Sequence, residues 1–200
     1  MRAYCFLSAV AMRSEPSDRA EMVNQLLKDD TFEILQQTEK WSFIRCDFDG
    51  YEGWVDNKQW KPTSAEANLT MGTGRSPATI AEQQYLNAPY LWGGRTSMGI
   101  DCSGLTQVCF RECGIRLLRD ASQQATQGIL IPSMDKIQRD DLCFFSNDQN
   151  RIIHVGIFMG DNHIIHSSGQ VRIDILTPEG IFNQELGRLT HRLHSVRRIR

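Results

Sequence analysis

The first 60 residues alternate between apolar and polar positions, which is the period of half-buried β-strands. β-favouring side chains follow this alternation in three short segments, residues 31–34, 41–48 and 51–55. Asp49-Gly50 lies between the second and third segments and is typical of a hairpin turn. Residues 13–30 are expected to form one long loop after a first strand. The pattern predicts a small β-barrel over residues 1–60.

The pattern changes after a stretch rich in Pro, Thr, Ser, Ala and Gly, residues 61–75, which is expected to be a linker. Ser76-Pro77 is a helix start, with Ser as N-cap and Pro at the first helical position. This helix should end near Asn87, because Pro89 disfavours helix in the residue before it. A second helix is predicted from Cys102 to Gly114, a residue suited to the position after a helix.

The remainder of the chain reads as strands. Apolar runs predict strands at residues 141–145, 152–159 and 163–168, and a last one near 195–199. Helices followed by a run of antiparallel strands indicate an α+β domain over residues 76–200.

Composition and charge narrow the function. The 200 residues include 22 basic and 24 acidic side chains, a net charge of −2, and no long basic run, so nucleic acid is not the expected partner. No apolar run approaches the ~18 residues of a membrane span. Residues 1–11 resemble a signal peptide with too short an apolar core, so a first β-strand is preferred and export is the alternative to the cytoplasm.

The six cysteines do not follow tight pairing patterns, which favours a reducing compartment. Cys102, Cys109 and Cys113 share a helical face, but the first two would lie ~10 Å apart along the axis, too far for one metal. No metal or organic cofactor is expected. Apart from Cys102, four cysteines are predicted to be small core residues: Cys46, Cys109, Cys113 and Cys143.

Cys102 stands where the second helix begins, and this gives it a special chemistry. Unpaired N–H groups at a helix start favour a thiolate and can stabilise an oxyanion. Flanking glycines suggest an open loop that a substrate can reach. A nucleophilic thiol needs a base, and His154 begins a predicted hairpin strand. With a three-residue turn His166 shares its face, whereas a two-residue turn puts His163 there.

Five segments give residues 76–200 a resemblance to the NlpC-type family of cell-wall peptidases, a branch of the papain-like fold. They are residues 90–94 (YLWGG), 101–105 (DCSGL), 141–145 (DLCFF), 154–157 (HVGI) and 166–169 (HSSG). The family triad is Cys-His-His. The resemblance therefore implies Cys102 as nucleophile, His154 as base and acid, and His166 as the residue that orients His154. His163 is then a surface residue, and His191 and His194 are surface or structural.

The N-terminal part resembles bacterial SH3-like domains, through segments 13–16, 20–27 and 49–55 and Trp41. It is most similar to those attached to γ-D-glutamyl-diamino-acid endopeptidases, also called dipeptidyl-peptidase VI. Such enzymes cut L-Ala-γ-D-Glu from the diamino acid, diaminopimelate or lysine, that follows it in peptidoglycan stem peptides. The aromatic residues Trp41, Tyr51 and Trp54 are equally explained as ordinary barrel residues.

The resemblance also implies the remaining site residues. The Cys102 backbone N–H and the Tyr90 hydroxyl would hold the oxyanion. Four further residues would line the substrate site: Glu21, Asp101, Ser103 and Ser122. Three of these four residues also have a simpler explanation. Asp101 and Ser122 are suitable helix N-caps, and Glu21 could be an ordinary solvated loop carboxylate.

The resulting expectation is a cysteine peptidase that recycles wall-derived peptides in the cytoplasm. If the barrel closes one end of the cleft, only peptides with a free L-Ala amino terminus would fit, and Glu21 would meet that ammonium. Two alternatives remain: an amidase or acyltransferase with the same thiol chemistry, and a wall-binding module with an inactive catalytic domain. Activity on a defined tripeptide distinguishes these three.

Overall fold

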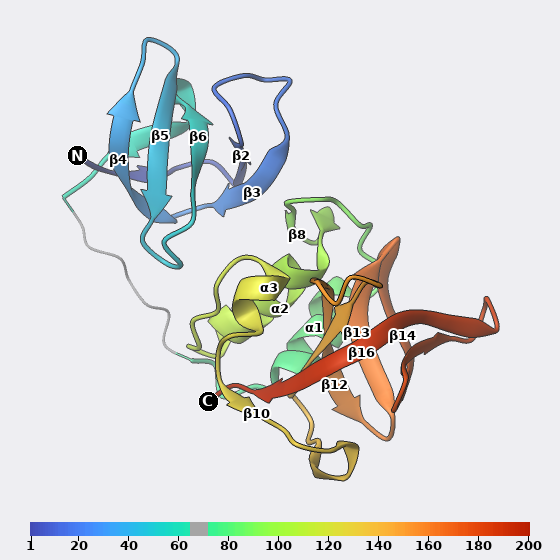
Figure 1. Cartoon of the computed structure of the whole chain (residues 1–200). Helices are drawn as coiled ribbons and strands as arrows, with labels where there is room; N and C mark the ends of the chain where they lie inside the picture. Colours follow the sequence, from blue (N-terminus) through green and yellow to red (C-terminus); the bar gives the residue numbers. More distant parts are fainter. Residues whose placement is uncertain (65–71) are drawn as a thin grey trace. The chain divides into compact units, whose positions relative to one another are not determined.

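A computed structural model describes residues 1–64 and 72–200 and divides the chain into two compact units (Figure 1). Of the described residues, the first unit comprises residues 1–64 together with Leu91–Thr96, and the second residues 72–90 together with Ser97–Arg200. The loop Leu91–Thr96 thus groups with the N-terminal unit, although the sequence pattern assigns it to the catalytic domain. Of the expected linker 61–75, residues 65–71 lie outside the described residues.

The first unit is an antiparallel seven-stranded sheet with strand order β3-β2-β6-β5-β4-β1-β7. Its strands are β1 (Arg2–Cys5), β2 (Ala9–Arg13), β3 (Met22–Leu27), β4 (Thr31–Gln37), β5 (Trp41–Cys46), β6 (Glu52–Asp56) and β7 (Trp60–Pro62). A 3₁₀ turn, η1 (Asn57–Gln59), precedes β7. β7 starts inside the expected barrel and ends inside the expected linker, where it pairs with β1. The apolar positions of the alternating strands form the core, with Ala3, Cys5, Phe32, Ile44 and Val55 fully buried.

The predicted long loop over residues 13–30 is wrong, because it contains β3. This strand pairs with β2, placing Ala9 opposite Leu27 and Met12 opposite Asn24. The inward positions of β3 are Asn24 and Leu26, and both are buried. A buried asparagine at an inward position interrupts the apolar alternation, so the strand had no clear signal in the sequence.

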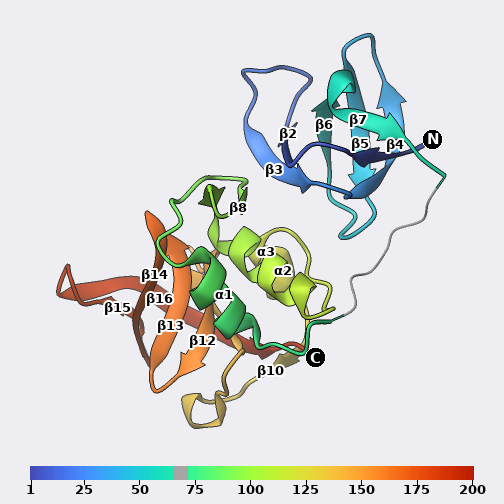
Figure 2. The same ribbon diagram turned by 180° about the vertical axis from the view of Figure 1, so that it is seen from behind.

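The second unit packs helices against one face of a second seven-stranded sheet. Its helices are α1 (Pro77–Tyr85), α2 (Cys102–Glu112) and α3 (Ala121–Gln124), with a 3₁₀ turn, η2 (Met134–Lys136). In Figure 2, α1 and α2 lie on one side of β12 (Ile152–Gly160) and β13 (His163–Ser168), and contacts join both helices to both strands. None of the described helices has the length and apolar character needed to span a bilayer.

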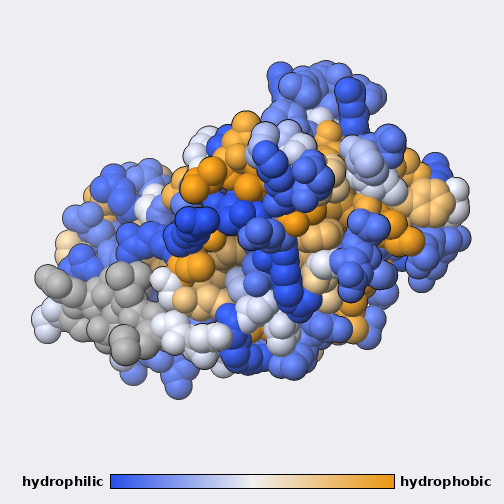
Figure 3. Space-filling model, turned by 90° about the horizontal axis from the view of Figure 1, so that it is seen from below, coloured by the Kyte–Doolittle hydropathy of each residue, from blue (hydrophilic) through white to orange (hydrophobic). Residues whose placement is uncertain are grey.

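The sheet of the second unit has the order β10-β16-β11-β12-β13-β14-β15. Its other strands are β10 (Ile129–Leu130), β11 (Leu142–Ser146), β14 (Gln170–Thr177), β15 (Gly180–Asn183) and β16 (Arg188–Arg198). Two short strands, β8 (Arg95–Thr96) and β9 (Gly99–Ile100), precede α2. The view of the whole chain in Figure 3 shows hydrophilic and hydrophobic side chains intermixed on that face.

The predicted helix starts and the strands β11 to β13 are confirmed. The Ser76 hydroxyl caps α1 by accepting from the Thr79 N–H, and Pro77 is the first helical residue. β14, β15 and the first half of β16 were not predicted. In β14 the buried positions are Val171, Asp174 and Leu176, which do not follow a strict alternation, and one of them is a carboxylate.

The turn between β12 and β13 determines which histidine faces His154. The chain reverses through two residues with positive φ, Asp161 and Asn162, and Gly160 pairs with His163. An irregularity between Phe158 and Gly160 then shifts the register by one residue, so that Gly156 pairs with His166. The turn therefore has two residues, but the bulge restores the register of the three-residue alternative, in which His154 and His166 share a face.

Candidate active site

Cys102 is the first residue of α2, where the sequence pattern places a nucleophile. The Asp101 carboxylate caps this helix by accepting from the Gly104 N–H at 2.6 Å. Backbone hydrogen bonds link Cys102 to Ser103 and to Val155, the residue after His154. The start of α2 and the middle of β12 therefore meet at the thiol. The expected open loop is not what surrounds it, because the side chain of Cys102 is buried and only 8% exposed.

Burial also changes the expected charge of the thiol. It raises the pKa of Cys102 to about 12, and the negative charge of Asp101 adds to the rise. The backbone hydrogen bonds from Val155 and Ser103, and the charge of Arg119, act in the opposite direction but do not prevail. A thiol at a helix start has partial positive charge near it, yet desolvation outweighs that effect here. Cys102 is thus a neutral thiol in the free protein.

His154 and His166 lie together on neighbouring strands, as the first of the two register alternatives predicts. Their rings are joined by a hydrogen bond of 2.9 Å between Nε2 of His154 and Nδ1 of His166. Both side chains are buried, whereas His163 is exposed beside the turn. The histidine hydrogen-bonded to His154 is therefore His166 and not His163.

A buried carboxylate lies behind His166, and the sequence analysis did not identify it. Nε2 of His166 is 3.1 Å from Oδ2 of Asp174, on the neighbouring strand β14. Arg172 donates to both carboxylate oxygens, from Nε at 2.9 Å and from Nη2 at 3.2 Å. Asp174 belongs to none of the segments that carry the family resemblance, so only the sheet register reveals it.

His191, which the resemblance leaves as surface or structural, stacks on His154. The ring centroids are 4.2 Å apart and the planes differ by 26°. Burial lowers the pKa of His154 well below its usual value, and the neighbouring His166 and His191 add to this effect. Burial also lowers the pKa of His191 to about 4, aided by His166 and opposed by Asp174. Both rings are therefore neutral at pH 7.

Asp101 and Ser103, two of the expected substrate contacts, are engaged by a buried cation. Arg119 is 1% exposed and donates from Nη2 to Oδ2 of Asp101 at 2.6 Å and from Nη1 to Oδ1 at 3.0 Å. The same Nη1 donates to the Ser103 hydroxyl at 2.9 Å. The helix-cap explanation of Asp101 is confirmed, and its charge is balanced by a residue that the sequence analysis did not single out.

Tyr90, the expected oxyanion donor, is half-exposed and lies close enough to Cys102 and Asp101 for a negative charge on either to affect its pKa. Burial raises the pKa of Tyr90 to about 12, and Cys102 and Asp101 raise it further in that order of effect. Its hydroxyl therefore keeps its proton and can donate. Ser122 is exposed at the second position of α3, whose N-cap is Asp120, so the N-cap explanation of Ser122 is wrong.

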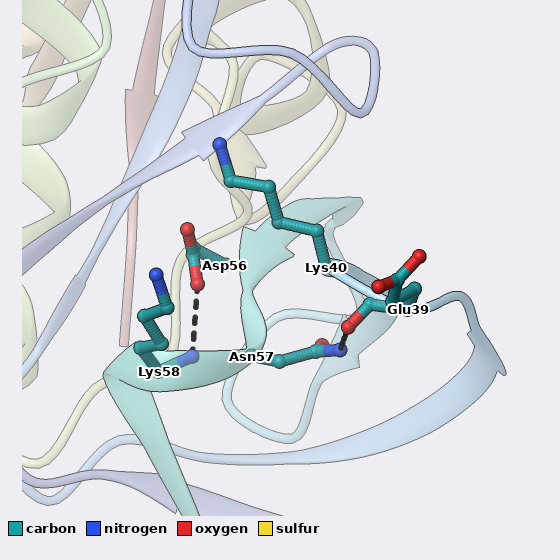
Figure 4. A pocket seen from close by; sticks show the side chains of 5 residues that line it. All are labelled: Glu39, Lys40, Asp56, Asn57 and Lys58. Atoms are coloured by element: carbon teal, nitrogen blue, oxygen red, sulfur yellow. Dashed lines mark hydrogen bonds between the residues drawn. The ribbon is translucent and has the colours of Figure 1, made fainter.

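Glu21 belongs to the first unit, unlike the other expected site residues. Its carboxylate accepts a hydrogen bond of 2.6 Å from the Trp92 indole, within the loop that groups with that unit. The first unit also carries a polar hollow of about 400 Å³ (Figure 4), lined by Glu39, Lys40, Asp56, Asn57 and Lys58. None of the candidate catalytic residues lines this hollow.

Comparison with known proteins gives two matches that follow the two units. The NlpC/P60 family matches residues 87–189, just over half of the chain. The family described as bacterial dipeptidyl-peptidase Sh3 domain matches residues 12–59. These matches cover the candidate residues Cys102, His154 and His166, and Glu21.

Two curated relatives carry the name gamma-D-glutamyl-L-lysine dipeptidyl-peptidase. The protein from Bacillus subtilis is 39% identical over 106 residues, which are 51% of this chain and 36% of the relative. The one from Bacillus cereus is 36% identical over 108 residues, 53% of this chain and 29% of the relative. The matched region therefore spans about a third of either relative.

A solved structure of an NlpC/P60 family protein from Bacillus cereus has the same fold. It aligns with a TM-score of 0.55 and 21% sequence identity, over 99% of this chain and 63% of the other. The N-terminal SH3-like unit and the papain-like α+β unit are thus both shown, as the sequence pattern predicts.

Proposed function

This chain belongs to the NlpC/P60 family, and on that premise we propose that it is a cysteine peptidase acting on peptides derived from peptidoglycan. One observation carries the proposal: a thiol at the start of α2 meets a strand whose His154 is hydrogen-bonded to His166. A nucleophile, a base and a group that orients the base are the parts that covalent acyl transfer requires. The names of the curated relatives point to the same chemistry.

The bond proposed to be cut joins γ-D-Glu to the diamino acid that follows it. His154 takes the proton of the Cys102 thiol while sulfur attacks the γ-carbonyl carbon. The negative oxygen that forms is held by the Cys102 backbone N–H and the Tyr90 hydroxyl. His154 then gives the proton to the departing amine, and the C–N bond breaks to leave a thioester on Cys102. Water, deprotonated by His154, releases the peptide acid and restores the thiol.

The finer specificity is also a proposal: the substrate carries a free amino terminus, as in L-Ala-γ-D-Glu-diamino acid. The relatives' names describe dipeptidyl-peptidases, which release two residues from an end. Acidic and hydroxyl groups suited to an ammonium lie next to the nucleophile, in Asp101 and Ser103. Arg119 neutralises Asp101 in the free protein, so the ammonium must share that carboxylate with a guanidinium. Ser122 and Glu21 stay proposed contacts.

The test is mass spectrometry of products after incubation with four tripeptides. These are L-Ala-γ-D-Glu-L-Lys and the diaminopimelate analogue, each with a free or an acetylated amino terminus. We expect L-Ala-γ-D-Glu and free diamino acid from the unblocked peptides only. Equal rates on blocked and free peptides would contradict the need for an amino terminus. No hydrolysis of any peptide would favour an amidase, an acyltransferase or a binding module instead.

We place this activity, as part of the same proposal, in cytoplasmic recycling of wall peptides. All six cysteines are unpaired, which suits a reducing compartment. Cell fractionation with antibody detection tests this. Recovery of the protein in the soluble cytoplasmic fraction is expected, and recovery outside the cell with a shortened amino terminus would contradict it.

A further inference from the structure

The site contains a buried carboxylate that the proposed reaction has not used. Asp174 is 2% exposed and lies on β14, one strand beyond His166. In the register of these strands Asp174 pairs with Ile164, while His166 pairs with Arg172. Asp174 is therefore the diagonal neighbour of His166 on the same face of the sheet.

Hydrogen-bond donors converge on one oxygen of this carboxylate. Oδ2 lies 3.1 Å from Nε2 of His166, 2.9 Å from Nε of Arg172 and 3.3 Å from Nδ2 of Asn183. Oδ1 receives Nη2 of Arg172 at 3.2 Å. Burial opposes ionisation, but the hydrogen bonds from His166 and Arg172 outweigh it and lower the pKa of Asp174. The carboxylate is ionised at pH 7.

An ionised carboxylate accepts hydrogen bonds and cannot donate them. Nε2 of His166 must therefore carry the hydrogen. In the neutral form of His166 this is the one N–H of the ring, so Nδ1 carries a lone pair. The 2.9 Å contact between the two rings then requires Nε2 of His154 to donate. The same rule leaves Nδ1 of His154 unprotonated, which is the form that a base needs.

We infer that Asp174 is a positioning residue that sets the proton positions of both histidines, so that His154 presents an unprotonated Nδ1 to the Cys102 thiol. This rests on the proposed function for the role of His154 as base. The direction of both hydrogen bonds, from His154 to His166 and from His166 to Asp174, follows from the carboxylate at the end of the chain. When His154 accepts the thiol proton, the same carboxylate stabilises the positive charge that forms.

Three variants separate this role from that of a structural ion pair. Asp174→Ala removes the acceptor, and both histidines can then adopt either neutral form. Asp174→Asn keeps one acceptor oxygen, which should occupy the Oδ2 position because three donors converge there and one reaches Oδ1. Asp141→Ala is the matched control. Asp141 is 1% exposed and binds Arg198 through both oxygens at 2.8 Å, and the structure shows it bonded to no histidine.

Steady-state kinetics on the free tripeptide give the first readout. We expect Asp174→Ala to lower kcat by about tenfold or more, a part of what general acid–base catalysis contributes, with KM within about twofold. Asp174→Asn should restore much of kcat. Asp141→Ala should lower the melting temperature and leave kcat of the folded enzyme unchanged. An equal kcat for Asp174→Ala and Asp141→Ala would overturn the inference.

Imidazole ¹⁵N NMR of the free enzyme gives the second readout, and it needs no turnover. The wild type should show His154 and His166 both protonated on Nε2, with Asp174→Asn like the wild type and Asp174→Ala shifted toward Nδ1. A wild-type enzyme with either histidine protonated on Nδ1 would overturn the inference, even if Asp174→Ala does not fold. If the wild type hydrolyses no tripeptide, the proposed function fails while this measurement still decides the role of Asp174.

Discussion

The protonation state of Cys102 can be tested directly by its reactivity. Burial raises the pKa of this thiol to about 12 and lowers that of His154 well below 6.5, so both groups should be neutral at pH 7. A thiol whose pKa is raised this far above the working pH stays almost entirely protonated. The expected resting state is therefore a neutral pair, in which His154 removes the proton only as sulfur attacks.

The sign of the pH dependence follows from the raised thiol pKa. Thiolate is the form that reacts with alkylating reagents, and its fraction grows with pH until the pKa is passed. The rate of alkylation of Cys102 by iodoacetamide should thus rise about tenfold per pH unit between pH 6 and 9, without a plateau. Lowering the pH should not create a reactive form, because burial holds the pKa of His154 well below its usual value and the ring does not become the cation that a thiolate–imidazolium pair needs.

The assay is quenched alkylation at each pH, followed by peptide mapping to separate Cys102 from Cys113, the half-buried thiol of α2's C-cap. Cys113 provides an internal comparison, because burial raises its pKa as well. A Cys102 rate that is already high at pH 5 and constant to pH 8 would refute the reasoning. That result would show a thiolate–imidazolium pair, in which the helix start outweighs burial.

Three further changes test separate parts of the site. Cys102→Ala should reduce tripeptide hydrolysis by several orders of magnitude, whereas Cys143→Ala in the β11 core should keep kcat and lower only the melting temperature; activity in Cys102→Ala would exclude it as nucleophile. His191→Ala should lower kcat by removing the ring stacked on the base, and His191→Phe should restore it; equal kcat values for the two variants would contradict a stacking role. Arg119→Met leaves the Asp101 carboxylate buried without its cation and should lower the free energy of unfolding by about 3–5 kcal/mol in urea titrations; a loss below about 1 kcal/mol would show that Asp101 finds water or another partner.

Local signals explain which elements were predictable from the sequence. Ser76-Pro77 and Gly114 act through their own backbone and their nearest neighbours, so α1 and the end of α2 need no knowledge of the fold. The strands β11 and β12 are largely apolar and buried at consecutive positions, so both faces of each strand are covered. For the same reason the α+β class of the second unit could be predicted.

Two of the strands that were not predicted, β3 and β14, escaped prediction for the same physical reason. β3 and β14 each place a polar side chain, Asn24 and Asp174, at a fully buried position. A buried carboxylate is tolerated only with hydrogen-bonding partners, and the partners of Asp174 include His166 on the next strand and Asn183 on β15. Those partners come together only after the sheet has formed, so no local sequence pattern predicts the strand.

The candidate site likewise contains residues that the sequence could predict and residues that it could not. Cys102 and the pair of histidines could be predicted, although the choice between His163 and His166 depended on a register that the bulge before Gly160 decides. Arg119 and His191 could not be predicted, because they reach the site from a loop and from β16, a strand far along the chain. The charge of the thiol also escaped prediction, since it depends on how deeply the folded chain buries Cys102.

The central claim, that Cys102 and His154 cut the γ-D-glutamyl bond, is tested most directly by hydrolysis in ¹⁸O-labelled water. L-Ala-γ-D-Glu-diamino acid is incubated with wild type and with Cys102→Ala, and the products are sequenced by tandem mass spectrometry. We expect heavy oxygen in the γ-carboxylate of the released L-Ala-γ-D-Glu from the wild type, and no product from the variant. Heavy oxygen in any other carboxylate, or product formation by the variant, would contradict it.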